Sequence, residues 1–316
     1  MRYTHQLLAF ILLDVEQYRA YLHNRSKEAT YIMLDPNKNI RSLKSWLFTP
    51  ATRPDRFEHA TKAGADVLIL DLEDAVALSN KETARNNAMT YLQTRPADGI
   101  TRALRINSPS TVEGFKDLQA LLFGAASPDY VILPKCDSPG TIALVHCLLH
   151  EAGKSAQIIA LIESARGVET LEEIVSASLK PVCLLFGAAD MAADLGATVD
   201  WEPLLWVRSR LVQAAALNGI ALVDSPFFAI ADPDGLKRET ESAFRMGFHG
   251  KCAIHPAQLA SLNAVFTPRA AEIAEARQVL VVNQQGVGSV NHKMVDEAFA
   301  RQARAVLMRA GLPVSE

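Results

Sequence analysis

Eight short, mostly apolar segments alternate with helical patterns along this chain, and this alternation constrains its fold more than any other feature. The apolar segments have the length and composition of buried parallel strands. They are Ser45–Thr49, Val67–Leu72, Ala103–Asn107, Tyr130–Pro134, Ile158–Glu163, Val182–Gly187, Ile220–Ser225 and His249–Ile254. The helical patterns between them are Pro54–Ala63, Lys81–Leu92, Thr111–Leu122, Gly140–His150, Gly167–Ser178, Trp201–Asn218 and Pro233–Met246. The alternation predicts an α/β fold, a (β/α)8 TIM barrel.

A doubly wound open sheet is the alternative to a closed barrel. No G-x-G-x-x-G motif follows the first predicted strand, which argues against the dinucleotide-binding form of that sheet. A length of 316 residues suits a (β/α)8 barrel with an appendage.

The two ends of the chain differ from the barrel region of residues 41–265. In residues 1–40, the apolar run Leu7–Leu13 is followed at once by acids and is too short for a membrane span. We expect an N-terminal helical extension there. Residues 266–316 predict a small C-terminal helical lid, with a polar hinge at residues 283–292 and a last helix from about Val295. The segment beyond this hinge, which carries Asp296, is expected to be too small to hold a core of its own.

Composition limits the classes of protein to which this chain can belong. It has 49% hydrophobic and 21% charged residues, as soluble globular proteins do, and a net charge of −3. That charge gives no reason to expect nucleic acid or an anionic membrane as a partner. The four cysteines show no C-x-x-C spacing, so we expect buried, reduced thiols in a cytoplasmic protein.

Two acids follow successive predicted strands in the middle of the chain. Glu163 ends Ile158–Glu163, and Asp190 lies four residues beyond Phe186. The carboxyl ends of parallel strands form the face on which such folds carry out their chemistry. Asp190 also begins a helix-like segment, whose free N–H groups favour an anion. The pattern predicts a divalent cation that holds a small carboxylate. Taken singly, each acid could instead be a helix cap or a solvated loop residue.

Other strand ends carry charged groups as well. Asp71, Glu73 and Asp74 follow the second strand, and Arg105 ends the third, where its planar guanidinium could grip a carboxylate with two hydrogen bonds. An ion pair with Asp71 or Glu73 is the alternative for Arg105, and we favour the functional interpretation. For His255, which precedes a proline at the eighth strand end, we favour a structural role.

The ordered motifs of the chain resemble those of one family. The motifs are L-F-T-P-A-T-R-P-D-R-F, L-I-L-D-L-E-D-A-V, R-I-N, L-P-K, A-L-I-E-S-A-R-G, F-G-A-A-D-M and I-H-P-A-Q, between about Arg41 and Arg304. Together they resemble the citrate lyase β-subunit-like family, within the HpcH/HpaI aldolase superfamily, which includes citryl-, malyl- and citramalyl-CoA lyases. The resemblance implies a TIM barrel, a Mg²⁺ site and a CoA-thioester substrate. It also implies a homotrimer, or a multiple of trimers, in which the C-terminal lid reaches the neighbouring subunit's active site.

The resemblance also assigns roles to individual residues. Glu163 and Asp190 match the metal ligands, and Arg105 matches the carboxylate-binding arginine. The K-M-V-D stretch matches the lid motif whose acid, here Asp296, transfers a proton. Where the family often has a proline two places after that acid, this chain has Ala298, so the turn departs from the family pattern.

These assignments predict a carbon–carbon lyase. The backbone N–H groups of Ala189 and Asp190, with Arg105, would orient the keto-acid part of the substrate, and Arg53 and Lys62 could meet the phosphates of CoA. Asp71, Glu73 and Asp74 are expected to contact the side chains that bind the ligands, without binding the ligands themselves. The first choice of substrate is (S)-citramalyl-CoA, with malyl-CoA and citryl-CoA also possible. The alternatives are a thioesterase, a CoA-independent aldolase, and a β subunit that works only within a carrier-protein lyase complex.

Overall fold

The structure is a computed structural model that describes residues 39–94, 98–284, 286, 288–291 and 293–313. The predicted N-terminal helix lies outside these residues. Within the described part, no helix is long and apolar enough to cross a membrane.

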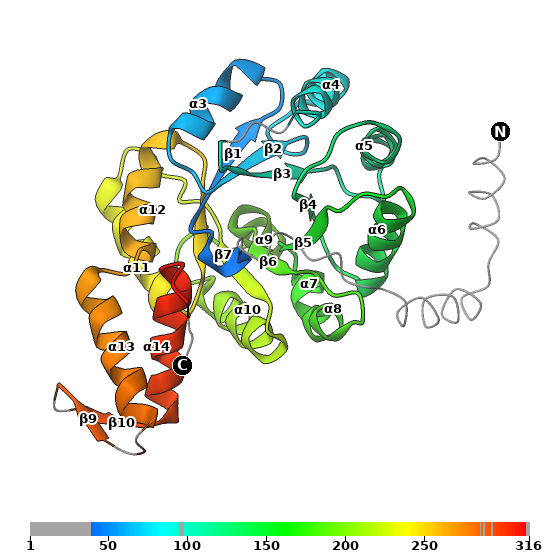
Figure 1. Cartoon of the computed structure of the whole chain (residues 1–316). Coiled ribbons are helices and arrows are strands. Elements are labelled where there is room, and N and C mark those ends of the chain that lie inside the picture. Colours follow the sequence, from blue (N-terminus) through cyan, green and yellow to red (C-terminus); the bar gives the residue numbers. More distant parts are fainter. Residues whose placement is uncertain (1–38, 95–97, 285, 287, 292, 314–316) are drawn as a thin grey trace. The chain divides into compact units, whose positions relative to one another are not determined.

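Eight parallel strands close into a barrel in sequence order, with β1 paired to β8. Strands β1 to β7 are labelled in Figure 1. The closed barrel confirms the predicted (β/α)8 fold and excludes the open sheet. The strands are β1 Ser45–Pro50, β2 Val67–Asp71, β3 Thr101–Arg105, β4 Tyr130–Leu133, β5 Gln157–Ile162, β6 Cys183–Phe186, β7 Ala221–Asp224 and β8 Gly250–Ala253.

Helices surround the strands, as Figure 1 shows, because each crossover between parallel strands returns along the outside of the sheet. The α-helices of the barrel are α3 Phe57–Lys62, α4 Lys81–Tyr91, α5 Val112–Phe123, α6 Pro139–Glu151, α7 Ala165–Glu169, α8 Leu171–Ser176, α9 Ala188–Leu195, α10 Leu205–Asn218, α11 Pro233–Met246 and α12 Leu259–Phe266. Short 3₁₀ turns precede several strands and helices: η1 Ile40–Ser42, η2 Pro54–Arg56, η3 Leu78–Asn80 and η4 Pro256–Gln258.

Two sets of strand residues build the core, because side chains alternate between the two faces of a strand. One set, with Leu68 and Leu104 among it, packs against the helices in a single large apolar cluster. The other fills the barrel. Trp46 of β1 and Tyr130 of β4, which are not neighbouring strands, place their ring centroids 6.0 Å apart across the interior. A filled interior leaves the rim at the carboxyl ends of the strands as the place for a site.

Strand boundaries differ from the prediction by one or two residues. The third strand was predicted as Ala103–Asn107 but runs Thr101–Arg105. Asn107 instead turns toward helix α5, where Asp117 accepts hydrogen bonds from its backbone N (2.8 Å) and its Nδ2 (2.6 Å). This polar partner ends the strand although Ile106 is apolar.

The C-terminal segment contains more structure than expected. Helix α13 (Ala270–Gln284) and helix α14 (Glu297–Arg309) pack on each other, and an antiparallel pair, β9 (Gly288–Val290) and β10 (Lys293–Val295), lies between them in sequence. The sequence did not predict these two strands, because each is only three residues long and carries little sequence pattern; the hinge itself stays a prediction. The segment beyond it packs on α13, as a segment too small for a core of its own must. Together these C-terminal elements form a small apolar cluster of Ala276, Val279, Val290, Val295, Ala303 and Leu307.

Candidate active site at the carboxyl ends of the strands

Glu163 and Asp190 both lie at the mouth of the barrel. Glu163 follows β5 directly and is buried, and Asp190 lies in the first turn of α9, which follows β6. Helix α9 has no side-chain cap at its N-cap residue, Gly187, so its first N–H groups remain available to a ligand. Ala189, in that first turn, is exposed. The structure thus brings the predicted cation ligands and the predicted anion cradle to the same rim.

Burial and neighbouring acids strongly perturb Glu163. Burial raises its pKa to about 8, with further contributions from the charges of Glu73 and Asp190. Burial also raises the pKa of Glu73, against the lowering effects of Arg105 and Lys135. Burial is thus the main cause of both shifts, and the neighbouring acids add to the shift of Glu163.

Arg105 is held by acids of the second strand end. Its Nε and Nη2 donate to the two carboxylate oxygens of Asp71 at 2.7 and 2.6 Å, a bidentate pair. Its Nη1 lies 2.9 Å from Glu73 Oε2 and 3.5 Å from Asp74 Oδ2, and its guanidinium carbon lies 4.8 Å from the centre of the Phe48 ring. Burial alone would lower the pKa of Arg105, but Asp71 and the other acids raise it overall. The predicted alternative, an ion pair, is therefore present.

The ion pair does not occupy the whole guanidinium. Among the described residues, none donates a hydrogen bond of suitable geometry to the buried Glu73 Oε2, and the contact of Nη1 with Asp74 is long. The Nη1 end of Arg105 is thus the part that could still donate to a substrate carboxylate.

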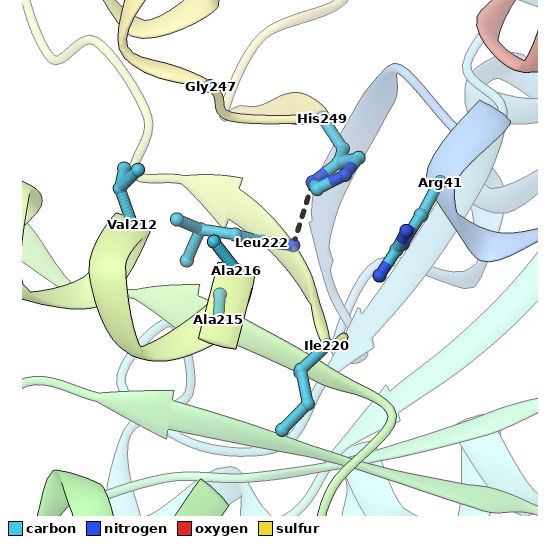
Figure 2. A pocket seen from close by; sticks show the side chains of 8 residues that line it. All are labelled: Arg41, Val212, Ala215, Ala216, Ile220, Leu222, Gly247 and His249. Carbon is cyan, nitrogen blue, oxygen red and sulfur yellow. Dashed lines mark hydrogen bonds between the residues drawn. The ribbon is translucent and has the colours of Figure 1, made fainter. Parts of the chain in front are cut away.

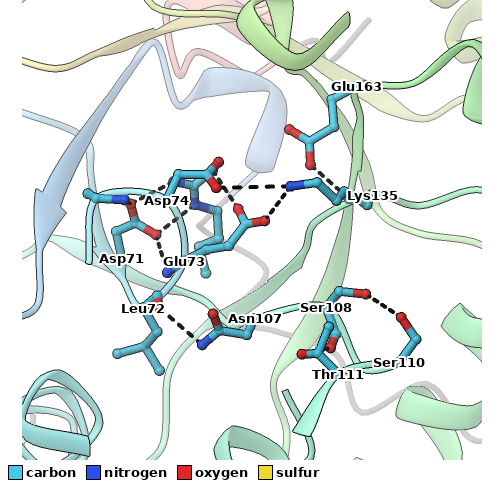
Figure 3. A network of polar contacts seen from close by, with 12 residues as sticks. Asp71, Leu72, Glu73, Asp74, Asn107, Ser108, Ser110, Thr111, Lys135 and Glu163 are labelled. Atoms are coloured by element: carbon cyan, nitrogen blue, oxygen red, sulfur yellow. Dashed lines mark hydrogen bonds and ion pairs between the residues drawn. The ribbon is translucent and has the colours of Figure 1, made fainter. Parts of the chain in front are cut away.

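Lys135 joins this network, although the sequence indicated no role for it. Its backbone N–H donates to Glu163 Oε1 at 2.8 Å, and its Nζ donates to Glu73 Oε1 at 2.9 Å (Figure 3). The signals in the sequence were its position directly after the fourth predicted strand and its place in the L-P-K motif.

The residues at the rim fit a divalent cation with an incomplete protein shell. Five carboxylates (Asp71, Glu73, Asp74, Glu163 and Asp190) face two cations, Arg105 and Lys135. In the part of the chain that the structure describes, no three Asp, Glu, His or Cys residues are grouped as a ready metal cage. Mg²⁺ does not require one, because it usually keeps several waters and binds one or two carboxylates together with substrate oxygens.

Asp296 lies outside this network within the chain. It is the N-cap of α14, where its Oδ1 accepts hydrogen bonds from the backbone N of Ala298 (2.8 Å) and of Phe299 (3.2 Å). Figure 1 shows β10 and the start of α14, which Asp296 caps, at the end of the α13–α14 pair that is away from the barrel strands. The structure therefore does not bring the predicted proton-transfer residue to the mouth of its own barrel.

The two predicted CoA-binding residues are both at the surface. Arg53 pairs with Asp55 at 2.7 Å, and Lys62 lies 3.7 Å from Glu58. Both pairs are solvent-exposed, so they are weak and leave the cations available to phosphates.

His255 has a structural contact, as expected, but as an exposed cap of η4 and not as a core imidazole. Its Nδ1 accepts from the backbone N of Ala257, and Gln258 completes a capping box at the start of η4.

A cavity of about 330 Å³ lies away from the predicted site residues. It is lined by Arg41, Val212, Ala215, Ala216, Ile220, Leu222, Gly247 and His249 (Figure 2). These residues come from η1, from helix α10 and from the starts of β7 and β8, so the cavity opens near the amino ends of the strands. His249 Nδ1 accepts a hydrogen bond from Leu222 N at 3.2 Å. None of the predicted site residues lines this cavity.

Comparison with known proteins identifies the family of this barrel. A family model described as HpcH/HpaI aldolase/citrate lyase matches residues 44–256. The chain belongs to this family. The membership confirms the resemblance carried by the motifs, and with it the prediction of a carbon–carbon lyase.

The similarity of this HpcH/HpaI family member to its relatives covers nearly the whole length of those relatives. The L-malyl-CoA/beta-methylmalyl-CoA lyase of Rhodobacter capsulatus is 33% identical over 87% of this chain and 96% of its own. The citrate lyase subunit beta-like protein of Mycobacterium tuberculosis is 34% identical over 88% of this chain and 100% of its own.

Solved structures give the same family. RipC from Yersinia pestis is 45% identical, with a TM-score of 0.66, over 74% of this chain and 100% of its own. CitE from M. tuberculosis, solved with magnesium, acetoacetate and coenzyme A, is 32% identical, with a TM-score of 0.72, over 86% of this chain and 99% of its own. The CitE complex supports the predicted cofactor, Mg²⁺ with CoA as part of the substrate.

Proposed function

We propose that this chain is a Mg²⁺-dependent lyase that cleaves a carbon–carbon bond in a short 3-hydroxyacyl-CoA thioester. The observation that carries the proposal is the placement of Glu163 and Asp190 after β5 and β6 at one rim, beside Arg105. The names of the relatives and the magnesium and coenzyme A in the CitE complex support the substrate class.

The first choice of substrate is (S)-citramalyl-CoA, which would give pyruvate and acetyl-CoA. Malyl-CoA, the substrate in the name of the R. capsulatus relative, and citryl-CoA are the other candidates. The three substrates differ by a methyl or carboxymethyl group, and one such group is worth only about 1–3 kcal/mol of discrimination. Activity on each substrate must therefore be measured.

Each residue at the rim has a defined task in this reaction. Mg²⁺, when bound by Glu163 and Asp190, would supply a Lewis acid that stabilises the substrate oxygen as it becomes a carbonyl. The Nη1 end of Arg105 and the N–H groups of Ala189 and Asp190 would hold the carboxylate of the keto-acid part. Asp71, Glu73 and Asp74 would keep the guanidinium of Arg105 in place.

Proton transfer completes the reaction. The hydroxyl loses its proton, the carbon–carbon bond breaks, and the thioester enolate that forms takes up a proton. Asp296 is the proposed shuttle. Because Asp296 caps α14, whose start lies away from the barrel strands, we propose that it serves a neighbouring subunit in a trimer, or a multiple of trimers. Arg53 and Lys62 would contact the phosphates of CoA from the surface.

A cytoplasmic location is also proposed. Three of the cysteines, Cys136, Cys183 and Cys252, are buried free thiols, as expected of a protein in a reducing compartment.

The relative named as a citrate lyase subunit favours one alternative function, the β subunit of a carrier-protein complex.

A substrate panel tests the proposal. Purified full-length protein with Mg²⁺ is given malyl-, citramalyl- and citryl-CoA, and keto acid and free CoA are both measured. Keto acid formed in the absence of any other protein is expected. Free CoA without keto acid would instead indicate a thioesterase, and activity only with an acyl carrier protein would indicate a complex subunit. Glu163→Ala or Asp190→Ala should abolish turnover in a folded barrel, and full activity of either variant with chelator present would contradict the metal site.

A further inference from the structure

Lys135 lies between two carboxylates of the rim, as Figure 3 shows. Its backbone N–H binds Glu163 Oε1 at 2.8 Å, and its side-chain Nζ binds Glu73 Oε1 at 2.9 Å and lies 4.0 Å from Asp74 Oδ1. One residue thus fixes both a proposed cation ligand and the acid beside it.

The backbone of Lys135 is in an unusual conformation. Its φ is +52°, and in the part of the chain described by the structure only Asn291 shares a positive φ among residues other than glycine. A lysine in the left-handed region is strained, and such strain persists where surrounding contacts impose it, often at functional sites. Lys135 makes its hydrogen bonds to Glu163 and Glu73 from this conformation.

Glu73 is the group that this arrangement restrains. It is buried, with 6% of its surface exposed, and no residue that the structure describes donates a hydrogen bond of suitable geometry to its Oε2. Lys135 contacts Glu163 Oε1 at 2.8 Å and Glu73 Oε1 at 2.9 Å, so the two carboxylates flank one residue. Glu73 therefore lies beside the proposed cation site, and Lys135 at Oε1 and Arg105 at Oε2 hold its two carboxylate oxygens.

We propose that Lys135 is a positioning residue that keeps Glu73 out of the divalent-cation site, so that Glu163 and Asp190 alone hold the cation. This inference rests on the proposed function for the location of the cation. Mg²⁺ is octahedral, and two carboxylate ligands leave positions for two substrate oxygens and for water. A third carboxylate would tighten the binding of the cation and occupy a position that the substrate needs.

The proposal predicts opposite effects on cation and substrate. Replacing Lys135 with methionine removes a positive charge and releases Glu73. Affinity for a divalent cation should rise about tenfold, because the carboxylate of Glu73 gains access to the site and the ammonium group of Lys135 is no longer beside it. The KM for the acyl-CoA substrate should rise and kcat should fall about tenfold or more, because the substrate loses both a coordination position and a nearby positive charge. If Lys135 only stabilised the fold, its replacement would not strengthen cation binding while it weakened turnover.

A Mn²⁺-binding measurement tests the proposal without turnover. Binding is measured as the decrease of the electron paramagnetic resonance signal of free Mn²⁺. The variants are Lys135→Met, Lys135→Gly and the double variant Lys135→Met/Glu73→Gln, all as full chains. Lys135→Gly serves as the second single variant because glycine accepts a positive φ without strain. Lys116→Met is the matched control, because Lys116 also pairs with a glutamate, Glu113, at 2.8 Å, but on helix α5.

The expected result is tighter Mn²⁺ binding by both single variants, return to wild-type affinity in the double variant, and no change in Lys116→Met. Unchanged or weaker binding by both single variants, with a circular dichroism spectrum like that of the wild type, would overturn the proposal. Tighter binding that persists in the double variant would overturn the role of Glu73. These results are separate from the proposed reaction: if no CoA ester is cleaved but Mn²⁺ binding changes as expected, the positioning role stands and the proposed function fails.

Discussion

A β-carbon on Gly187 would lie 2.5 Å from Cβ of Glu163 and 2.6 Å from its Oε2, so the two residues cannot both carry side chains in this arrangement. Gly187 is the N-cap of α9, and its N–H donates to Ile162 O at 3.0 Å. The start of α9 is thereby packed directly against the acid that follows β5. This close approach sets the separation of Glu163 from Asp190.

Gly187→Ala should therefore displace Glu163 while the barrel stays folded. Because a side-chain position shifted by about 1 Å can cost 10²-fold in rate, we expect kcat/KM to fall by about that factor and Mn²⁺ affinity to weaken. Gly140→Ala is the control, since a β-carbon there would meet only Ser138 Oγ at 3.3 Å. Equal activity of the two variants would show that Glu163 does not need its present position.

Arg105→Lys should lower kcat/KM by two or more orders of magnitude. Lysine keeps the charge but cannot make the bidentate contact with Asp71, so the donor facing the substrate would lose its fixed direction. Steady-state kinetics with the best substrate of the panel measure the loss.

Arg102→Lys provides the control for Arg105 on the same strand. Arg102 is equally buried and also forms an ion pair, with Asp98, but it lies at the other end of β3. Thermal unfolding should show a lower Tm for both variants, and only Arg105→Lys should lose activity. A similar loss of activity in both would assign Arg105 a purely structural role.

The sequence predicted the barrel because hydrophobic runs identify buried strands, but it did not give the contacts that arrange the site. The acids at the strand ends could be located because parallel strands bring their carboxyl ends to one rim. The role of Lys135 could not, because it depends on a positive φ and on two partners that are 28 and 62 residues away in sequence. Nor could the contact of Gly187 with Glu163, which exists only once β5 and β6 are paired.

His249 should make the fold sensitive to mild acid. Burial, together with the charges of Arg41 and Arg309, lowers its pKa from 6.5 to about 4. Between pH 6.5 and pH 4, His249 is therefore protonated in the unfolded chain but not in the folded chain. The free energy of unfolding decreases as the pH falls through this range. The loss from this group is about 2 kcal/mol at pH 5.

Urea unfolding at pH 7 and pH 5 measures this effect. His249→Gln removes the titrating group, so its stability should fall about 2 kcal/mol less between the two pH values than that of the wild type. His59→Gln, at an exposed position on α3, should behave as the wild type does. An identical pH dependence of wild type and His249→Gln would show that His249 is protonated in the folded state.

The proton-transfer role of Asp296 can be separated from its role as a helix cap. Asparagine caps helices about as well as aspartate, so Asp296→Asn should keep the contacts with Ala298 and Phe299 and leave α14 folded. Its activity should nevertheless fall by two or more orders of magnitude, because asparagine cannot transfer the proton. Glu297→Gln, at the next position in the chain, should remain active.

Mixing two inactive variants then tests whether Asp296 acts on a neighbouring subunit. Asp296→Asn keeps an intact cation site, and Glu163→Ala keeps an intact Asp296. If the site is shared, subunit exchange creates some sites that combine Asp296 from one chain with Glu163 from another, so part of the activity should return. Exchange confirmed by native mass spectrometry without any recovery of activity would contradict the shared site, because every residue would then have to act within its own chain. A fully active monomer would exclude it.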